Sequence, residues 1–64
     1  MNLKDNLKQL RKAKNLSQRD LAEASEVTPA YIAMLETGRR TNPTKEILEK
    51  LAHALDASVA QLLK

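Results

Sequence analysis

The chain has 64 residues, a formal net charge of +3 and no cysteine. A chain this short forms one domain at most and buries only about 60% of the surface that it exposes when unfolded. Without Cys it has neither a disulfide framework nor a thiolate metal site, and its one aromatic residue, Tyr31, excludes a stacking platform for single-stranded nucleic acid. β-Branched residues are sparse, so we expect an all-α bundle of about five short helices, a single domain over residues 1–64.

Basic residues gather in two parts of the sequence. The first twenty residues hold six basic side chains and two acidic ones, namely Lys4, Lys8, Arg11, Lys12, Lys14 and Arg19 against Asp5 and Asp20. Arg39, Arg40 and Lys45 form a second basic group. This segregation favours a polyanionic partner. A solvated surface of mixed charge is the alternative that charge alone leaves open.

The first two predicted helices are short. Leu3, Leu7 and Leu10 have helical spacing, with Asn2 as a candidate cap and an end near Asn15. The run Ser17 to Asp20 has the form of a capping box, which opens a second helix with Leu21 and Ala22 facing inward. This helix has to end before Thr28, because the residue before a proline avoids the helical conformation.

A third helix is predicted over about residues 28–37. Thr28 is a good N-cap, Pro29 suits the first helical position, and Gly38 can take the left-handed conformation beyond the last turn. Ile32 and Leu35 point inward. The helix therefore presents a largely apolar outer face.

Two helices follow a polar connection. Thr44 caps a fourth helix, in which Leu48, Leu51, Ala52 and Leu55 form the strongest amphipathic pattern of the chain. A capping box from Ser58 to Gln61 opens a short fifth helix. Its apolar residues either cap the core or supply a small dimer face; they are Val59, Leu62 and Leu63.

Enzymatic and metal-binding functions have little support in the sequence. His53 is the only histidine, Glu46 and Glu49 fit a solvated helix face, and the cap explains Ser17 without a catalytic base. No apolar run reaches the roughly 20 residues of a membrane span. We expect a cytoplasmic protein that is not an enzyme and has no metal, cofactor or membrane partner.

The run "LSQRDLAEASEVTPAYIAMLETGRRTNPTKEILEKLAHALDASVAQLL" resembles the helix-turn-helix domain of the Cro/phage-repressor (XRE) family. The matching elements are "LSQ", "LAE", "V-T/S-x-x-Y-I", "LE-x-G", "L-x-K-LA-x-AL" and "S-V-x-x-LL". Within the family, the connection "RRTNP" most resembles the SinR-type repressors. The resemblance implies a lambda-repressor-like fold whose third helix enters the major groove of duplex DNA.

The resemblance also implies roles for individual residues. Gln18 matches a glutamine that contacts the DNA backbone and supports the recognition helix, and Arg11 with Glu36 matches a family ion pair of structural value. The positions that face base edges or flanking phosphates are Thr28, Pro29, Ala30, Tyr31, Ala33 and Met34. The remaining positions expected at phosphates are Arg19, Thr37, Arg39, Arg40 and Thr41, together with Arg11 and lysines of the first helix. Met34 as core filler, and Tyr31 packed on the second helix, are the alternatives for those two side chains.

Three positions depart from the family pattern, which commonly has glycine where this chain has Asn15, Glu26 and Asp56. Glu26 is the most costly, because a left-handed conformation costs a non-glycine residue about 1–2 kcal/mol. We therefore expect Glu26→Gly to stabilise the domain.

The outer face of the third helix lacks the Arg, Lys, Asn and Gln side chains that usually read guanine and adenine. Apolar contacts with thymine methyl groups, a T-rich preference and a large phosphate contribution are the expected result. The function predicted is sequence-selective DNA binding in a transcriptional regulator, with repression as the family's more common outcome and a homodimer on two half-sites as a possible assembly. The alternative is a protein-interaction module that docks a partner on Ala30, Ala33 and Met34.

Overall fold

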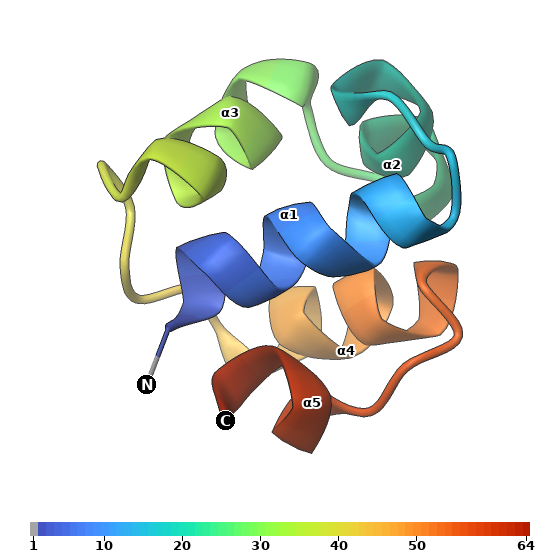
Figure 1. The fold of residues 1–64 in the computed structure, drawn as a ribbon. Coiled ribbons are helices and arrows are strands. Elements are labelled where there is room, and N and C mark those ends of the chain that lie inside the picture. Colours follow the sequence, from blue (N-terminus) through green and yellow to red (C-terminus); the bar gives the residue numbers. More distant parts are fainter. Residues whose placement is uncertain (1) are drawn as a thin grey trace.

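The computed structural model describes residues 2–64 and contains five α-helices in this part of the chain. They are α1 (Leu3–Ala13), α2 (Gln18–Ser25), α3 (Pro29–Thr37), α4 (Lys45–Ala54) and α5 (Val59–Leu63). Helix α1 lies across the middle of the bundle, with α2 and α3 on one side of it and α4 and α5 on the other (Figure 1). The predicted all-α fold of about five short helices is confirmed.

Side-chain caps begin four of the helices. Thr28 and Thr44 each accept a hydrogen bond from the backbone N–H three residues on, and Ser17 and Ser58 form complete capping boxes with Asp20 and Gln61. These caps satisfy N–H groups that a helix leaves without partners. The expectation for Asn2 was wrong: it precedes α1, but its side chain makes no capping hydrogen bond. Its φ of −141° and ψ of 61° differ from the extended backbone of the other four cap residues.

Left-handed residues end the first four helices. Asn15, Glu26 and Asp56 have φ of 58°, 62° and 52°, and Gly38 has φ of 83°. At each of the three non-glycine positions, the next residue donates its N–H to a carbonyl five residues back, with N···O distances of 2.9 to 3.1 Å. These bonds satisfy the last helical carbonyls. Residue type predicted Asn15 and Gly38, and the family resemblance predicted Glu26 and Asp56; all four predictions are confirmed.

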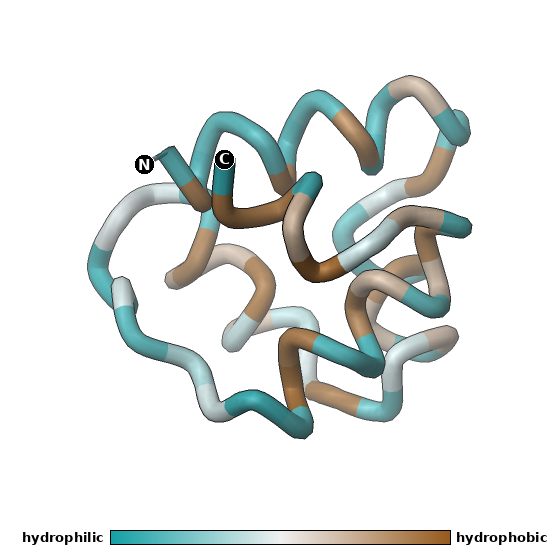
Figure 2. Tube along the Cα trace, turned by 90° about the horizontal axis from the view of Figure 1, so that it is seen from below, coloured by the Kyte–Doolittle hydropathy of each residue, from teal (hydrophilic) through white to brown (hydrophobic). Residues whose placement is uncertain are grey.

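The core is a single cluster of buried apolar residues, mostly leucines, to which all five helices contribute. Figure 2 shows hydrophilic residues along the outer turns of α1 and hydrophobic residues where it faces the rest of the bundle. The buried apolar residues are Leu7, Leu21, Ala22, Ile32, Leu35, Leu48, Leu51, Ala52, Leu55 and Leu62. Leu62 is therefore a core residue, while Val59 and Leu63 are half-buried against it.

The ends of the described chain lie close together beside α1 (Figure 1). The Asn6 side-chain amide donates to the carbonyl oxygens of Leu62 and Lys64, both at 2.9 Å. This clamp joins α5 to α1. Among residues 2–64, no helix is long and apolar enough to cross a membrane.

Candidate nucleic-acid interface

Helices α2 and α3 form a compact pair joined by a tight turn of three residues, Glu26 to Thr28. Ile32 and Leu35 are fully buried beneath α3, and Leu21 and Ala22 hold α2 on the same core. This burial fixes α3 on the body of the domain, so its outer side faces solvent as a rigid surface.

The outer side of α3 is mostly small and apolar. Pro29 and Ala30 are exposed, and Ala33 and Met34 are half-buried. Tyr31 is half-buried and packs against the core. None of these side chains carries charge, so this surface offers apolar contact rather than strong hydrogen bonding.

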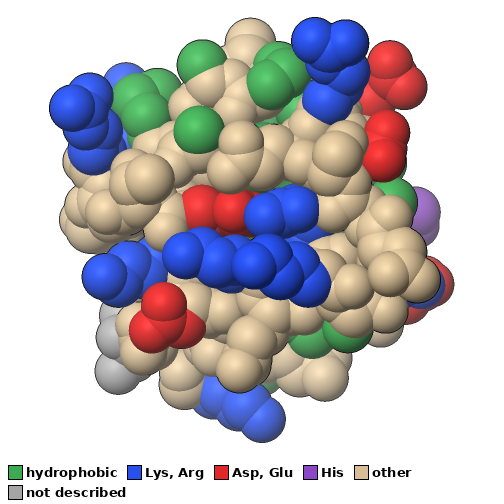
Figure 3. All heavy atoms as spheres, turned by 45° about the horizontal axis from the view of Figure 1, so that its top comes forward, with side chains coloured by type: hydrophobic (Ala, Val, Ile, Leu, Met, Phe, Trp, Pro, Cys, Tyr) green, Lys and Arg blue, Asp and Glu red, His purple; other side chains and the backbone are tan. Residues whose placement is uncertain are grey.

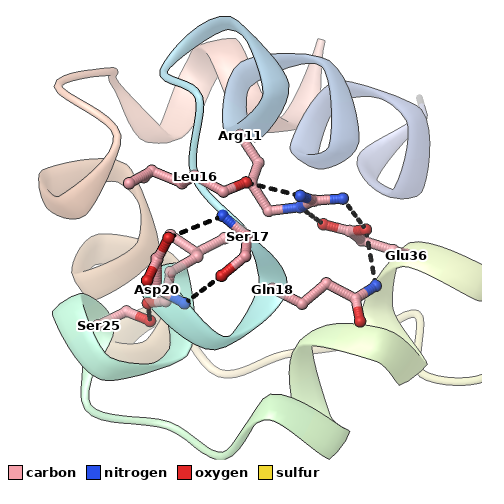
Figure 4. A network of polar contacts seen from close by, with 8 residues as sticks. Arg11, Leu16, Ser17, Gln18, Asp20, Ser25 and Glu36 are labelled. Atoms are coloured by element: carbon pink, nitrogen blue, oxygen red, sulfur yellow. Dashed lines mark hydrogen bonds and ion pairs between the residues drawn. The ribbon is translucent and has the colours of Figure 1, made fainter.

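A polar network lies beside α3, on the side of α1 and α2 (Figure 4). The Glu36 carboxylate accepts from Arg11 Nε at 2.6 Å and Arg11 Nη2 at 3.0 Å, a bidentate ion pair. Gln18 Nε2 donates to the same carboxylate at 3.1 Å, and Arg11 Nη1 donates to the Leu16 carbonyl at 2.7 Å. The network thus joins three helices through one carboxylate.

Glu36 is 3% exposed and the Arg11 side chain 11%, so their charges meet with little water between them. Burial raises the pKa of the Glu36 carboxyl, but hydrogen bonds from Arg11 and Gln18 and the charges of Arg11 and Lys8 outweigh it and lower this pKa below its ordinary value. The hydrogen bond to Glu36 raises the pKa of Arg11. The pair is therefore fully ionised at neutral pH.

The predicted Arg11–Glu36 pair is present, and it changes the expectation for both Arg11 and Gln18. Because Glu36 engages two of its nitrogens, Arg11 has less of its guanidinium left for a phosphate. Gln18 donates to Glu36 through its amide nitrogen. This hydrogen bond sets the orientation of its amide oxygen and of its second amide N–H. Their contacts with DNA stay predictions.

The segment after α3 is basic and exposed. Thr37, Arg39, Arg40 and Thr41 are all exposed, and no ion pair within residues 2–64 involves Arg39 or Arg40. The guanidinium carbon of Arg40 lies 5.7 Å from the centroid of the Tyr31 ring, a cation–π arrangement. Nothing in the sequence pattern pointed to this pairing, since the two positions are nine apart in the sequence.

Figure 3 shows this face of the molecule with a band of basic side chains across its middle and hydrophobic side chains gathered along the upper part. Arg19 is also exposed, at the start of α2. Helical spacing along α1 relates Lys4, Lys8 and Arg11. The two lysines were not singled out in the sequence-based expectation, which named them only among the lysines of the first helix. Their i, i+4, i+7 spacing is the signal that places them on one side of α1.

A short helix pair with a rigid outer face, flanked by basic residues, defines the class of helix-turn-helix domains. The helix-turn-helix family profile matches residues 7–62. The chain belongs to the helix-turn-helix family of the Cro/C1 (XRE) type.

The relatives are transcriptional regulators. The chain is 42% identical over 57 residues to the HTH-type transcriptional regulator SinR of Bacillus subtilis, covering 89% of this chain and 51% of the relative. It is 38% identical over 64 residues to the regulator DdrOP3 of Deinococcus deserti, covering 100% of this chain and 49% of the relative. The chain thus spans about half the length of the curated relatives it matches.

Solved structures agree with the fold. A crystal structure of SinR, the master regulator for biofilm formation, in complex with DNA superposes with a TM-score of 0.94 at 39% identity, covering 97% of this chain and 98% of that chain. The restriction-modification controller protein C.AhdI of Aeromonas hydrophila superposes with a TM-score of 0.90 at 38% identity, covering 95% and 91%. The family and these relatives are regulators, so the expectation of a protein that is not an enzyme is confirmed.

Proposed function

We propose that this chain is the DNA-binding domain of a transcriptional regulator, with α3 in the major groove of duplex DNA. The observation that carries the proposal is the position of the apolar outer face of α3 between two polar flanks. On one flank the Arg11–Glu36–Gln18 network holds polar groups beside α2, and on the other Arg39 and Arg40 have no carboxylate partner within the described residues. The similarity to a SinR structure that contains DNA supports it.

The two kinds of contact divide the work. Phosphate contacts position a protein on DNA, and base contacts specify the sequence. We assign the phosphates to Arg39, Arg40 and Thr41 on one side of α3 and to Gln18 on the other. Base contacts fall to Thr28 and to the apolar side chains of α3, which suit thymine methyl groups.

Residues 1–64 make one domain in this proposal, and one such domain covers one half-site. Two copies about one helical turn apart would bind a two-half-site operator. We propose that binding represses transcription, since repression is the family's more common outcome. The proposed location is the cytoplasm. The exposed α5 surface is not assigned to pairing, because Leu62 is committed to the core.

The test is the affinity of the purified chain for a fluorescently labelled mixed-sequence duplex, measured by anisotropy over a series of salt concentrations. A DNA-binding domain that neutralises several phosphates shows an affinity that falls linearly on a log–log plot as salt rises. Selection from a random pool then tests for a T-rich preference. Failure to bind duplex DNA at low salt would favour a protein partner on Ala30, Ala33 and Met34 instead.

A further inference from the structure

We propose that the hollow between the start of α1 and the turn after α3 is a seat for one phosphate of the DNA backbone, held by Lys4 and Arg40. The inference deepens the proposed function and rests on it. It assigns Lys4, among the lysines of the first helix, to one particular phosphate together with Arg40, and it gives Tyr31 a supporting part.

The hollow has a volume of about 420 Å³ and opens to solvent. It is lined by Asn2, Leu3, Lys4, Leu35, Thr37, Gly38, Arg40 and Thr41. None of these lining residues is acidic, while two are cationic and two carry hydroxyl groups. Ammonium, guanidinium and hydroxyl donors around a space without carboxylates suit an anion with several acceptor oxygens.

The aliphatic part of the Lys4 side chain lies beside the turn after α3. The Cδ atom of Lys4 lies 3.4 Å from the point where a Cβ on Gly38 would stand, and Gly38 has φ of +83°. The aliphatic part of the Lys4 side chain therefore packs against the turn at Gly38, where the absence of a side chain leaves room for it. None of the ion pairs within residues 2–64 uses Lys4.

Arg40 is held from two sides. Its backbone N–H donates to the Met34 carbonyl at 3.1 Å, and its guanidinium lies over the Tyr31 ring at 5.7 Å. A side chain that is already oriented loses less freedom when it binds. Tyr31 is then a positioning residue for Arg40.

A backbone phosphodiester is the anion that the surroundings favour. The seat continues the exposed basic segment of Arg39 to Thr41 and adjoins the C-terminal end of α3. When α3 lies in the major groove, a phosphate strand borders the groove beside it. One seat that combines α1 with the turn after α3 would fix the tilt of α3 in the groove.

The test compares Lys4→Gln with Lys14→Gln in anisotropy titrations of a mixed-sequence duplex over a salt series. Lys14 directly follows the last residue of α1, and its ammonium pairs with Asp56 at 2.5 Å, so it serves as a control with the same change of charge. Loss of one phosphate contact lowers the salt slope by about 0.9 and weakens binding about 5- to 10-fold near 0.1 M salt. We expect this for Lys4→Gln, no change of slope for Lys14→Gln, and recovery of the slope in Lys4→Arg.

Equal slopes for Lys4→Gln and Lys14→Gln, with wild-type binding intact, would overturn the seat and leave the proposed function standing. A wild-type chain that does not bind the duplex would overturn both. Amide NMR titration with inorganic phosphate separates the sources: saturable shifts at Gly38 and Thr41 together with an unchanged Lys4→Gln slope would mean a site for free phosphate and would contradict the DNA assignment. Thermal melts of each variant confirm that the compared chains are folded.

Discussion

The two flanks of α3 use their cations differently. On the side of α1 and α2, half-buried Arg11 pairs with buried Glu36, and its charge is neutralised within the domain. On the side of the turn, Arg39 and Arg40 have no carboxylate partner among residues 2–64, and Arg40 rests on an aromatic ring instead. A buried pair gives position and little net charge, whereas unpaired cations give affinity for phosphates. Basic residues near a recognition helix are therefore not equivalent.

The largest expected effect comes from the unpaired flank. The double substitution of Arg39→Ala with Arg40→Ala removes two phosphate contacts, so the salt slope falls by about 1.8 and duplex affinity near 0.1 M salt falls about 50-fold. Anisotropy titrations over a salt series measure both. A slope that stays at the wild-type value would show that these arginines do not contact phosphates.

On the flank that holds the Arg11–Glu36 pair, we expect a substitution to change the stability of the fold. Glu36→Gln leaves half-buried Arg11 beside a neutral acceptor, so the free energy of unfolding falls by about 2 kcal/mol. Urea denaturation at pH 7 measures the loss. Glu49→Gln, on the exposed face of α4, is the matched control and should change stability little. An effect of Glu36→Gln no larger than that control would mean that the pair contributes nothing net.

The same pair predicts a dependence on pH. The pKa of Glu36 is lower in the folded chain than its ordinary value of 4.5, so the folded chain binds a proton less readily than the unfolded chain. The stabilisation is complete above the unfolded pKa and is lost as the pH falls through the folded pKa. Asp20 and Asp56, whose carboxyl pKa values are also lowered by the hydrogen bonds from Ser17 and from Lys14, lose their contributions in the same acid range.

Comparison of two chains isolates the part that belongs to Glu36. The difference in unfolding free energy between wild type and Glu36→Gln should be constant from pH 7 to pH 5 and should shrink as the pH falls below about 4.5. Urea titrations at a series of pH values provide the measurement. A difference that stays constant down to pH 3 would contradict a lowered pKa.

A substitution in the turn before α3 should have a smaller effect and should stabilise the fold. Glu26 has φ of 62° and ψ of 36°, and its carboxylate makes only an exposed ion pair with Lys50 at 3.6 Å. Glycine relieves the left-handed strain but gains entropy in the unfolded chain, so Glu26→Gly should stabilise the fold by about 0.5–1 kcal/mol. Thermal or urea unfolding tests this, with Glu23→Gly as the opposite control, because position 23 is inside α2. An unchanged or lower midpoint for Glu26→Gly would refute the strain argument.

The smallest effect concerns the platform beneath Arg40. Tyr31→Leu should weaken DNA binding about 2- to 5-fold, the magnitude of an exposed cation–π contact, while Tyr31→Phe keeps the affinity. In an Arg40→Ala background, Tyr31→Leu should add no further loss. If Tyr31→Phe costs as much as Tyr31→Leu, the hydroxyl itself contacts DNA and Tyr31 is not a positioning residue.

Local signals in the sequence predicted most of the fold. Caps at Ser17, Thr28, Thr44 and Ser58 and the left-handed end at Gly38 depend on neighbouring residues only, and they appear where the sequence placed them. The left-handed conformation of Glu26 and Asp56 was instead expected from the family pattern. Asn2 failed because a good capping residue type does not by itself adopt capping geometry.

Less of the candidate site than of the fold could be predicted from the sequence. The family resemblance indicated the Arg11–Glu36 pair, but neither the Gln18 bond to Glu36 nor the Tyr31–Arg40 contact follows from spacing. Both join positions that only the packing of α3 brings together. The contact of the Lys4 side chain with the turn at Gly38, on which the proposed phosphate seat rests, is likewise a product of packing.

The most direct test of DNA reading by α3 is an amide NMR titration with a mixed-sequence duplex at low and at moderate salt. The proposed interface predicts shifts concentrated at Gln18, at residues 28–34 and at residues 39–41, and these shifts should fade as salt rises. Signals of these residues that stay unmoved at low salt would contradict DNA binding through α3 and would assign its apolar outer face to a protein partner.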